Sequence, residues 1–179
     1  PGQAAFSSAL IITRSGMINA QGTAAEPIIF TSSADAIEPG MITSPNMDPS
    51  TRGLWGGVII LGEAPISAQN DNDQDVAELQ IEGVPTSEDA LYGGNNDADN
   101  SGTLSYVSIR HGGTTIGDGN EINGLTLGGV GSGTTINNIE VTGNADDGIE
   151  WFGGSVSLTN VLIWNSGDDG LDTDQDWIG

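Results

Sequence analysis

Carboxylates recur at a fixed spacing in the last third of the chain. Asp146–Asp147 are followed by Asp168–Asp169 after 22 positions, and Glu150 is followed by Asp172 at the same spacing. If one repeat stacks on the next as neighbouring strands do, equivalent carboxylates lie about 4.8 Å apart. Two charges at that distance repel by roughly 3.5 kcal/mol at an effective dielectric constant of about 20. Raised pKa values, exposure to water or bound cations relieve such repulsion, so the pattern predicts a solvated turn, a cation site or, as a third alternative, catalysis.

Calcium is the cation that these side chains suit, because it binds oxygen ligands. The stretch Asp97–Gly102 is similar to the first half of a calcium loop, although the acidic residue that would complete an EF-hand is missing. Asp71–Asp75 and Asp172–Asp176 repeat the alternation of oxygen-bearing residues without the glycine. Because Asp and Gly are also common turn residues, solvated turns remain the alternative. We expect calcium at two places: Asp97, Asp99 and Ser101 form the first, and Asp147, Asp169 and Asp172 the second.

The net charge limits the possible partners. The 179 residues include 25 Asp and Glu against three Arg and no Lys, for a formal charge of −22. A nucleic-acid binder that neutralises phosphates is therefore excluded, and an acidic polysaccharide is a poor substrate. No apolar run reaches the roughly 18 residues of a membrane span, so we expect no membrane insertion. Cysteine is absent, which excludes disulfides, thiolate metal sites and a cysteine nucleophile.

The elements that must position the carboxylates are short strands in a repeat. Residues 136–150 align without a gap on residues 158–172, and apolar, Asn, acidic and Gly residues match at most positions. A unit of 22 residues with several short strands predicts one rung of a parallel β-helix. Apolar positions of one rung should then stack on those of the next, and Asn138 should stack on Asn160 in an asparagine ladder. Tyr106 occupies this position in a looser copy, so the ladder should stop there.

The rest of the chain follows the repeat less closely. The looser copy comprises residues 104–109 and 123–127, with residues 112–120 looping out. Three earlier apolar strands are expected at residues 10–13, 28–31 and 58–61. Long surface excursions are expected at residues 35–52 and 64–102, where Pro, Gly and polar residues dominate. We therefore predict an all-β fold: a single-domain, right-handed parallel β-helix over residues 1–179, with long side loops. We also expect the chain to be a fragment of a longer secreted protein. The hand follows the crossover rule.

Catalysis would depend on one His and three Arg. Polysaccharide lyases and galacturonan hydrolases use this fold class, with Asp clusters on adjacent rungs. Here Arg110 and His111 precede Asp168–Asp169, whereas such a hydrolase would have them on later rungs. We therefore interpret His111 as a strand-end residue. The four Trp residues are candidates either for a sugar-stacking platform or for packing against rung faces and loops; they are Trp55, Trp151, Trp164 and Trp177.

Several blocks of sequence resemble a known group of proteins. The blocks are residues 52–66, 81–85, 92–102, 121–134 and 146–154. They are similar to a family of large secreted proteins of Gram-negative bacteria with parallel β-helix repeats. The resemblance implies the fold and an extracellular or outer-surface location, but it implies no activity.

These expectations define a function and a rival. We expect a non-enzymatic structural or adhesive segment of an extracellular or cell-surface protein, stabilised by calcium. Its open solenoid ends would be covered by further rungs or other chains, and glycans are further candidate partners. The alternative is a carbohydrate-active enzyme or a glycan-binding module.

Overall fold

The computed structural model describes residues 8–70, 72–114 and 122–179. Within these ranges the chain consists of strands, turns and one short 3-10 helix, η2, which confirms the all-β prediction. The elements in chain order are β1 (Ala9–Ile12), β2 (Ile18–Gln21), β3 (Ile28–Phe30), β4 (Gly57–Leu61), β5 (Ala68–Gln69), β6 (Asp75–Val76), β7 (Glu78–Gln80), η2 (Glu88–Ala90), β8 (Leu91–Gly93), β9 (Gly102–Arg110), β10 (Leu125–Gly128), β11 (Thr135–Thr142), β12 (Ile149–Phe152), β13 (Leu158–Trp164) and β14 (Leu171–Asp174).

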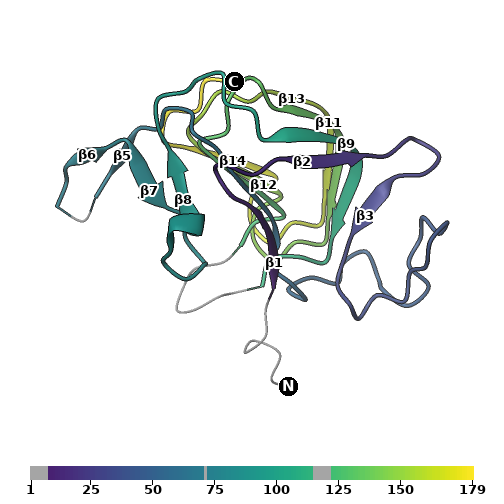
Figure 1. Ribbon diagram of the computed structural model, residues 1–179. Coiled ribbons are helices and arrows are strands. Elements are labelled where there is room, and N and C mark those ends of the chain that lie inside the picture. Colours follow the sequence, from purple (N-terminus) through teal and green to yellow (C-terminus); the bar gives the residue numbers. More distant parts are fainter. Residues whose placement is uncertain (1–7, 71, 115–121) are drawn as a thin grey trace.

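Most strands belong to two parallel sheets that form the walls of a coil (Figure 1). Sheet A has the order β1-β4-β10-β12-β14, and sheet B has the order β2-β9-β11-β13, with β3 also paired to β9. Ile136 pairs with Leu158 and Ile149 pairs with Leu171, so one 22-residue repeat is one rung. The looser copy is the preceding rung, because Leu104 pairs with Ile136. The predicted parallel β-helix is therefore confirmed.

Alternate residues of both sheets point into the coil and form its core. In β12, Ile149 and Trp151 are buried inside, while Glu150 and Phe152 face outward from sheet A. The inner side chains are aliphatic on most rungs, as expected for columns that bury apolar surface between neighbours. Leu171 continues the column of Ile149 on the edge strand β14 but is 56% exposed.

The bend in the middle of the sheet B strands has a left-handed backbone on three successive rungs. Tyr106, Asn138 and Asn160 have φ angles of 50°, 52° and 57°. Asn160 Nδ2 donates to Asn138 Oδ1 at 3.2 Å, which confirms the asparagine ladder. Asn tolerates this conformation better than other non-glycine residues, whereas Tyr106 adopts it without an amide to extend the ladder.

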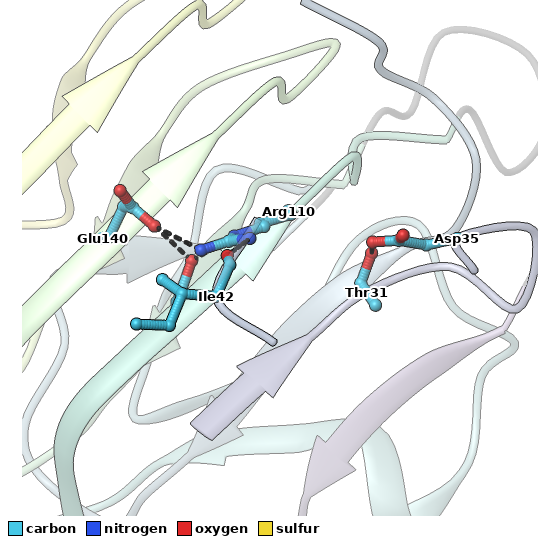
Figure 2. A network of polar contacts seen from close by, with 6 residues as sticks. Thr31, Asp35, Ile42, Arg110 and Glu140 are labelled. Atoms are coloured by element: carbon cyan, nitrogen blue, oxygen red, sulfur yellow. Dashed lines mark hydrogen bonds and ion pairs between the residues drawn. The ribbon is translucent and has the colours of Figure 1, made fainter. Parts of the chain in front are cut away.

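The first excursion, residues 35–52, contains turns rather than strands, as expected. Its shape is held by side chains that bond to one another and to the backbone. Ser44 Oγ donates to Asp35 Oδ1 at 2.6 Å, and Asn46 Oδ1 accepts from the N–H of Ala36 at 2.8 Å. Thr31 Oγ1 donates to Asp35 Oδ2 at 2.9 Å (Figure 2). The predicted loop at residues 112–120 falls mostly on residues 115–121, which lie outside the described residues.

The second excursion, residues 64–102, lies outside the coil but is not the irregular loop that we expected. It contains two antiparallel hairpins, β5-β6 and β7-β8, together with η2 (Figure 1). These strands have only two or three residues each, too few to show an alternating pattern in the sequence. We call this excursion the arm. It contributes Ile81, Ala90 and Tyr92 to a second apolar core, in which they pack with Ile59 and Phe152. The arm therefore covers the outer face of sheet A.

Candidate functional site

The predicted column of carboxylates lies on the outer face of sheet A. Glu150 of β12 pairs with Thr126 of β10 on one side and with Asp172 of β14 on the other. Asp147 lies in the turn before β12. One carboxylate oxygen from each of Asp147, Glu150 and Asp172 can be chosen so that all three lie within 4.8 Å of one another. Two of the predicted ligands, Asp147 and Asp172, are thus brought together, and Glu150 joins them.

Glu150 is one of the two buried acids of this group, together with Asp147. It is 7% exposed, and burial raises its pKa from 4.5 to about 8. A hydrogen bond from Asn123 Nδ2 to Glu150 Oε2 opposes the rise, and repulsion from Glu82, Asp147 and Asp172 adds to it. At neutral pH the site therefore holds this carboxyl group largely as the neutral acid.

Asp147 and Asp169 occupy equivalent places in successive rungs but act differently. Burial raises the pKa of Asp147, which is 7% exposed, and the backbone N–H of Asp169 opposes the rise by donating to Asp147 Oδ1 at 2.8 Å. Asp169 thus contributes a backbone donor here. A second group, formed by Asp146, Asp147 and Asp168, also has carboxylate oxygens within 4.8 Å of one another.

Asn123 is a site residue that the sequence analysis did not select. It is buried at 2% exposure, and its Nδ2 donates to Glu150 while its Oδ1 has no hydrogen-bond partner among the described residues. The signal for it was present in the sequence. Asn123, Asp147 and Asp169 each precede a Gly and an apolar strand residue, so Asn123 is the equivalent of Asp147 on the preceding rung.

Asp97, Asp99 and Ser101, the first predicted calcium site, lie in the turn before β9. The Asp99 carboxylate is 5% exposed and accepts from the Ser101 hydroxyl at 3.3 Å and from the N–H of Gly131 at 3.2 Å. Asp97 has an exposed side chain, and its backbone oxygen accepts from the hydroxyls of Ser132 and Ser155. Asp99 and Asp97 therefore join this turn to the loops that follow β10 and β12.

Comparison with protein families decides the identity of the fold. Residues 2–179 match the family described as the pectate-lyase like beta helix domain. The chain belongs to this family. Comparisons with curated proteins and with solved structures found no match. No helix among the described residues is long and apolar enough to cross a membrane.

Arg110 and His111 of this β-helix domain have structural contacts. His111 follows the last residue of β9, as predicted for a strand-end residue, and is 2% exposed. Its Nδ1 lies 2.8 Å from the backbone oxygen of Thr51. Arg110 forms an ion pair with Glu140 at 3.3 Å. Both residues therefore attach the first excursion and the neighbouring rung to β9.

Three of the four Trp residues pack against other parts of the protein, which was the alternative to a sugar-stacking platform. Trp151 and Trp177 have ring centroids 4.9 Å apart, and Trp55 Nε1 donates to the backbone oxygen of Arg110 at 2.7 Å. Trp164 differs because it points outward from sheet B and is 53% exposed. A four-residue stacking platform is therefore wrong, but one exposed ring remains.

Proposed function

We propose that this β-helix domain is a non-enzymatic structural or adhesive segment of a secreted, extracellular or cell-surface protein, stabilised by calcium on sheet A. The observation that supports the proposal is the group of Asp147, Glu150 and Asp172. Two of these three acids are buried, and one carboxylate oxygen from each can be chosen so that all three lie within 4.8 Å of one another. Calcium accepts several carboxylate and amide oxygens, which is the chemistry available there.

The surroundings of the group support a cation. The ion pairs found among the described residues, Arg14–Glu78 and Arg110–Glu140, involve none of its three acids. The chain has no Lys and no Arg after Arg110. The buried Asn123 Oδ1, which lacks a partner among the described residues, adds an uncharged oxygen beside Glu150. A divalent ion would offset the repulsion, and millimolar extracellular calcium is sufficient for weak sites of this kind.

The structural role is supported by the edge of the coil at β13 and β14. Leu171 stands at a core position yet is exposed, and Ile178 beyond it is 76% exposed. No strand of the described residues pairs with the outer edge of β13 or of β14, so other strands can join both edges. We infer that further rungs or other chains cover this edge, and that the two excursions form the surface offered to partners.

Thermal unfolding in excess chelator and in about 1 mM calcium tests the proposal, since that concentration suits weak extracellular sites. Calcium should raise the melting temperature by roughly 3–6 °C if its concentration is about ten times the dissociation constant. Asp172→Asn should abolish the rise, whereas Glu88→Gln, a change at an exposed acid outside the group, should retain it. Equal melting temperatures in chelator and calcium for the unsubstituted chain would show that the group binds no calcium.

A further inference from the structure

A pocket opens on the outer face of sheet B, away from the carboxylates of sheet A. Its volume is about 350 Å³, within the range of small-molecule sites. Ile42, Met47 and Pro49 of the first excursion form one wall, and Arg110, Glu140, Thr142 and Trp164 come from three neighbouring strands. We call this the sheet B pocket.

The polar floor of the sheet B pocket is fixed and carries little net charge. Arg110 donates from Nε to Ser108 Oγ at 2.7 Å, from Nη1 to the backbone oxygen of Ile42 at 2.7 Å, and from Nη2 to Glu140 Oε2 at 3.3 Å. Figure 2 shows Arg110 between Glu140 and Ile42. The ion pair neutralises the guanidinium, so the described residues that line the pocket offer no unpaired guanidinium to an anionic ligand.

Two features of the pocket lack a counterpart among the described residues. Thr142 is 7% exposed, and its Oγ1 has no hydrogen-bond partner among the described residues. Such a buried hydroxyl is costly unless something bonds to it. Trp164 pairs with Thr142 on the adjacent strand, and half of its surface is open to solvent. Both described contacts of the Glu140 carboxylate also fall on one oxygen, Oε2.

We propose that the sheet B pocket binds a neutral saccharide. A sugar ring has an apolar face of C–H groups that stacks on an aromatic ring, and hydroxyls at its edge that bond to carboxylate and hydroxyl groups. Trp164 supplies the ring, Thr142 and Glu140 supply the polar partners, and Ile42 and Met47 shield the opposite side. The net charge of −22 and the neutralised Arg110 disfavour an acidic sugar.

Calorimetric titration of the full chain with maltohexaose, cellohexaose, mannohexaose and xylohexaose tests the inference, with trigalacturonate as the anionic comparison. At least one neutral probe should bind with a dissociation constant below about 1 mM. Trp164→Ala should weaken that binding about tenfold by removing the stacking surface. Thr142→Val keeps the shape but removes the hydroxyl, and should weaken binding roughly fivefold without loss of stability.

Ile178→Ala is the matched control, because it removes an exposed apolar side chain outside the pocket and should leave the affinity unchanged. The proposal is overturned if no neutral probe binds at concentrations up to about 10 mM. It is also overturned if trigalacturonate binds as tightly as the best neutral probe, or if both pocket variants retain full affinity. Trp164 is exposed, so its removal tests binding without threatening the fold.

Discussion

Asn123 and Asp147 occupy the same place on successive rungs, but only Asn123 donates a hydrogen bond to the acid that follows it on the next rung. Asn123 donates to Glu150, whereas Asp147 lies with Asp172 in a group whose chosen carboxylate oxygens are within 4.8 Å of one another. An amide on one rung is thus replaced by a charge on the next. The change turns a favourable contact into a like-charge contact.

Asp147→Asn should therefore stabilise the protein in chelator. The new amide can donate to Asp172 as Asn123 does to Glu150, and its oxygen can still accept the N–H of Asp169. We expect the free energy of unfolding to rise by about 1 kcal/mol, measured by urea denaturation, and any stabilisation by calcium to disappear. Glu88→Gln, at an exposed acid outside the group, provides the control for removing one charge. A destabilised Asp147→Asn variant in chelator would show that the carboxylate itself is needed by the turn.

The turn before β9 gives a second prediction, because Asp97 and Asp99 use different atoms. Asp99→Ala removes an acceptor for the N–H of Gly131 and the hydroxyl of Ser101, and should lower the free energy of unfolding by about 1–3 kcal/mol. Asp97→Ala should change it by less than about 0.5 kcal/mol, since the Asp97 bonds are made by its backbone oxygen.

Chemical denaturation with and without calcium distinguishes this structural role from the predicted first calcium site. If the two variants lower stability only when calcium is present, and by similar amounts, both carboxylates are ligands. A loss confined to Asp99→Ala and independent of calcium would instead identify a turn held by hydrogen bonds.

The rungs between Ile136 and Asp172 could be predicted from the sequence because their repeat has no gap. Each apolar column, the asparagine ladder and the pairing of Glu150 with Asp172 follow from one spacing of 22 residues. Earlier rungs obey the same physics, but their spacing varies. Val58 of β4 pairs with Leu125 of β10 across the whole second excursion, so the sequence offers no period to detect.

The sequence analysis missed site features that depend on rungs and loops whose spacing differs from 22 residues. Asn123 lies 24 positions before Asp147, because its rung is longer, and a search at 22 positions passes over it. The deep burial of Glu150 and the repulsion from Glu82 of the arm are also invisible in a linear pattern. Residues 64–102 show only turn-rich composition, since strands of two or three residues cannot display alternation.

The bend of β9 gives a third prediction. Tyr106 has a left-handed backbone next to Asn138 on the following rung, at a site where Asn is favoured. Tyr106→Asn should raise the free energy of unfolding by about 0.5–1 kcal/mol by relieving strain and by adding an amide to the ladder. Urea denaturation measures the change. Tyr106→Gly separates the two effects, because it relieves strain without an amide; an equal gain from both variants would show that the ladder bond contributes nothing.

The pH dependence of stability follows from Glu150. Its pKa rises from 4.5 to about 8 on folding, so the folded state holds this proton more tightly than the unfolded chain. Linkage then requires the contribution of Glu150 to be complete below about pH 4.5 and to be lost as the pH rises through about 8. We expect the free energy of unfolding in chelator to fall by a few kcal/mol across this interval, and Glu150→Gln, which stays neutral, to remove most of the fall.

Urea denaturation of both proteins between pH 5 and 8.5 measures this slope, with exposed Glu88→Gln as the control that should retain it. Calcium sharpens the test, because an ion bound by Glu150 favours the charged carboxylate and competes with the proton. Saturating calcium should therefore flatten the profile of the unsubstituted chain but leave that of Glu150→Gln nearly unchanged. A slope that is the same in both proteins, with calcium and without it, would show that Glu150 titrates in the folded state much as it does in the unfolded chain.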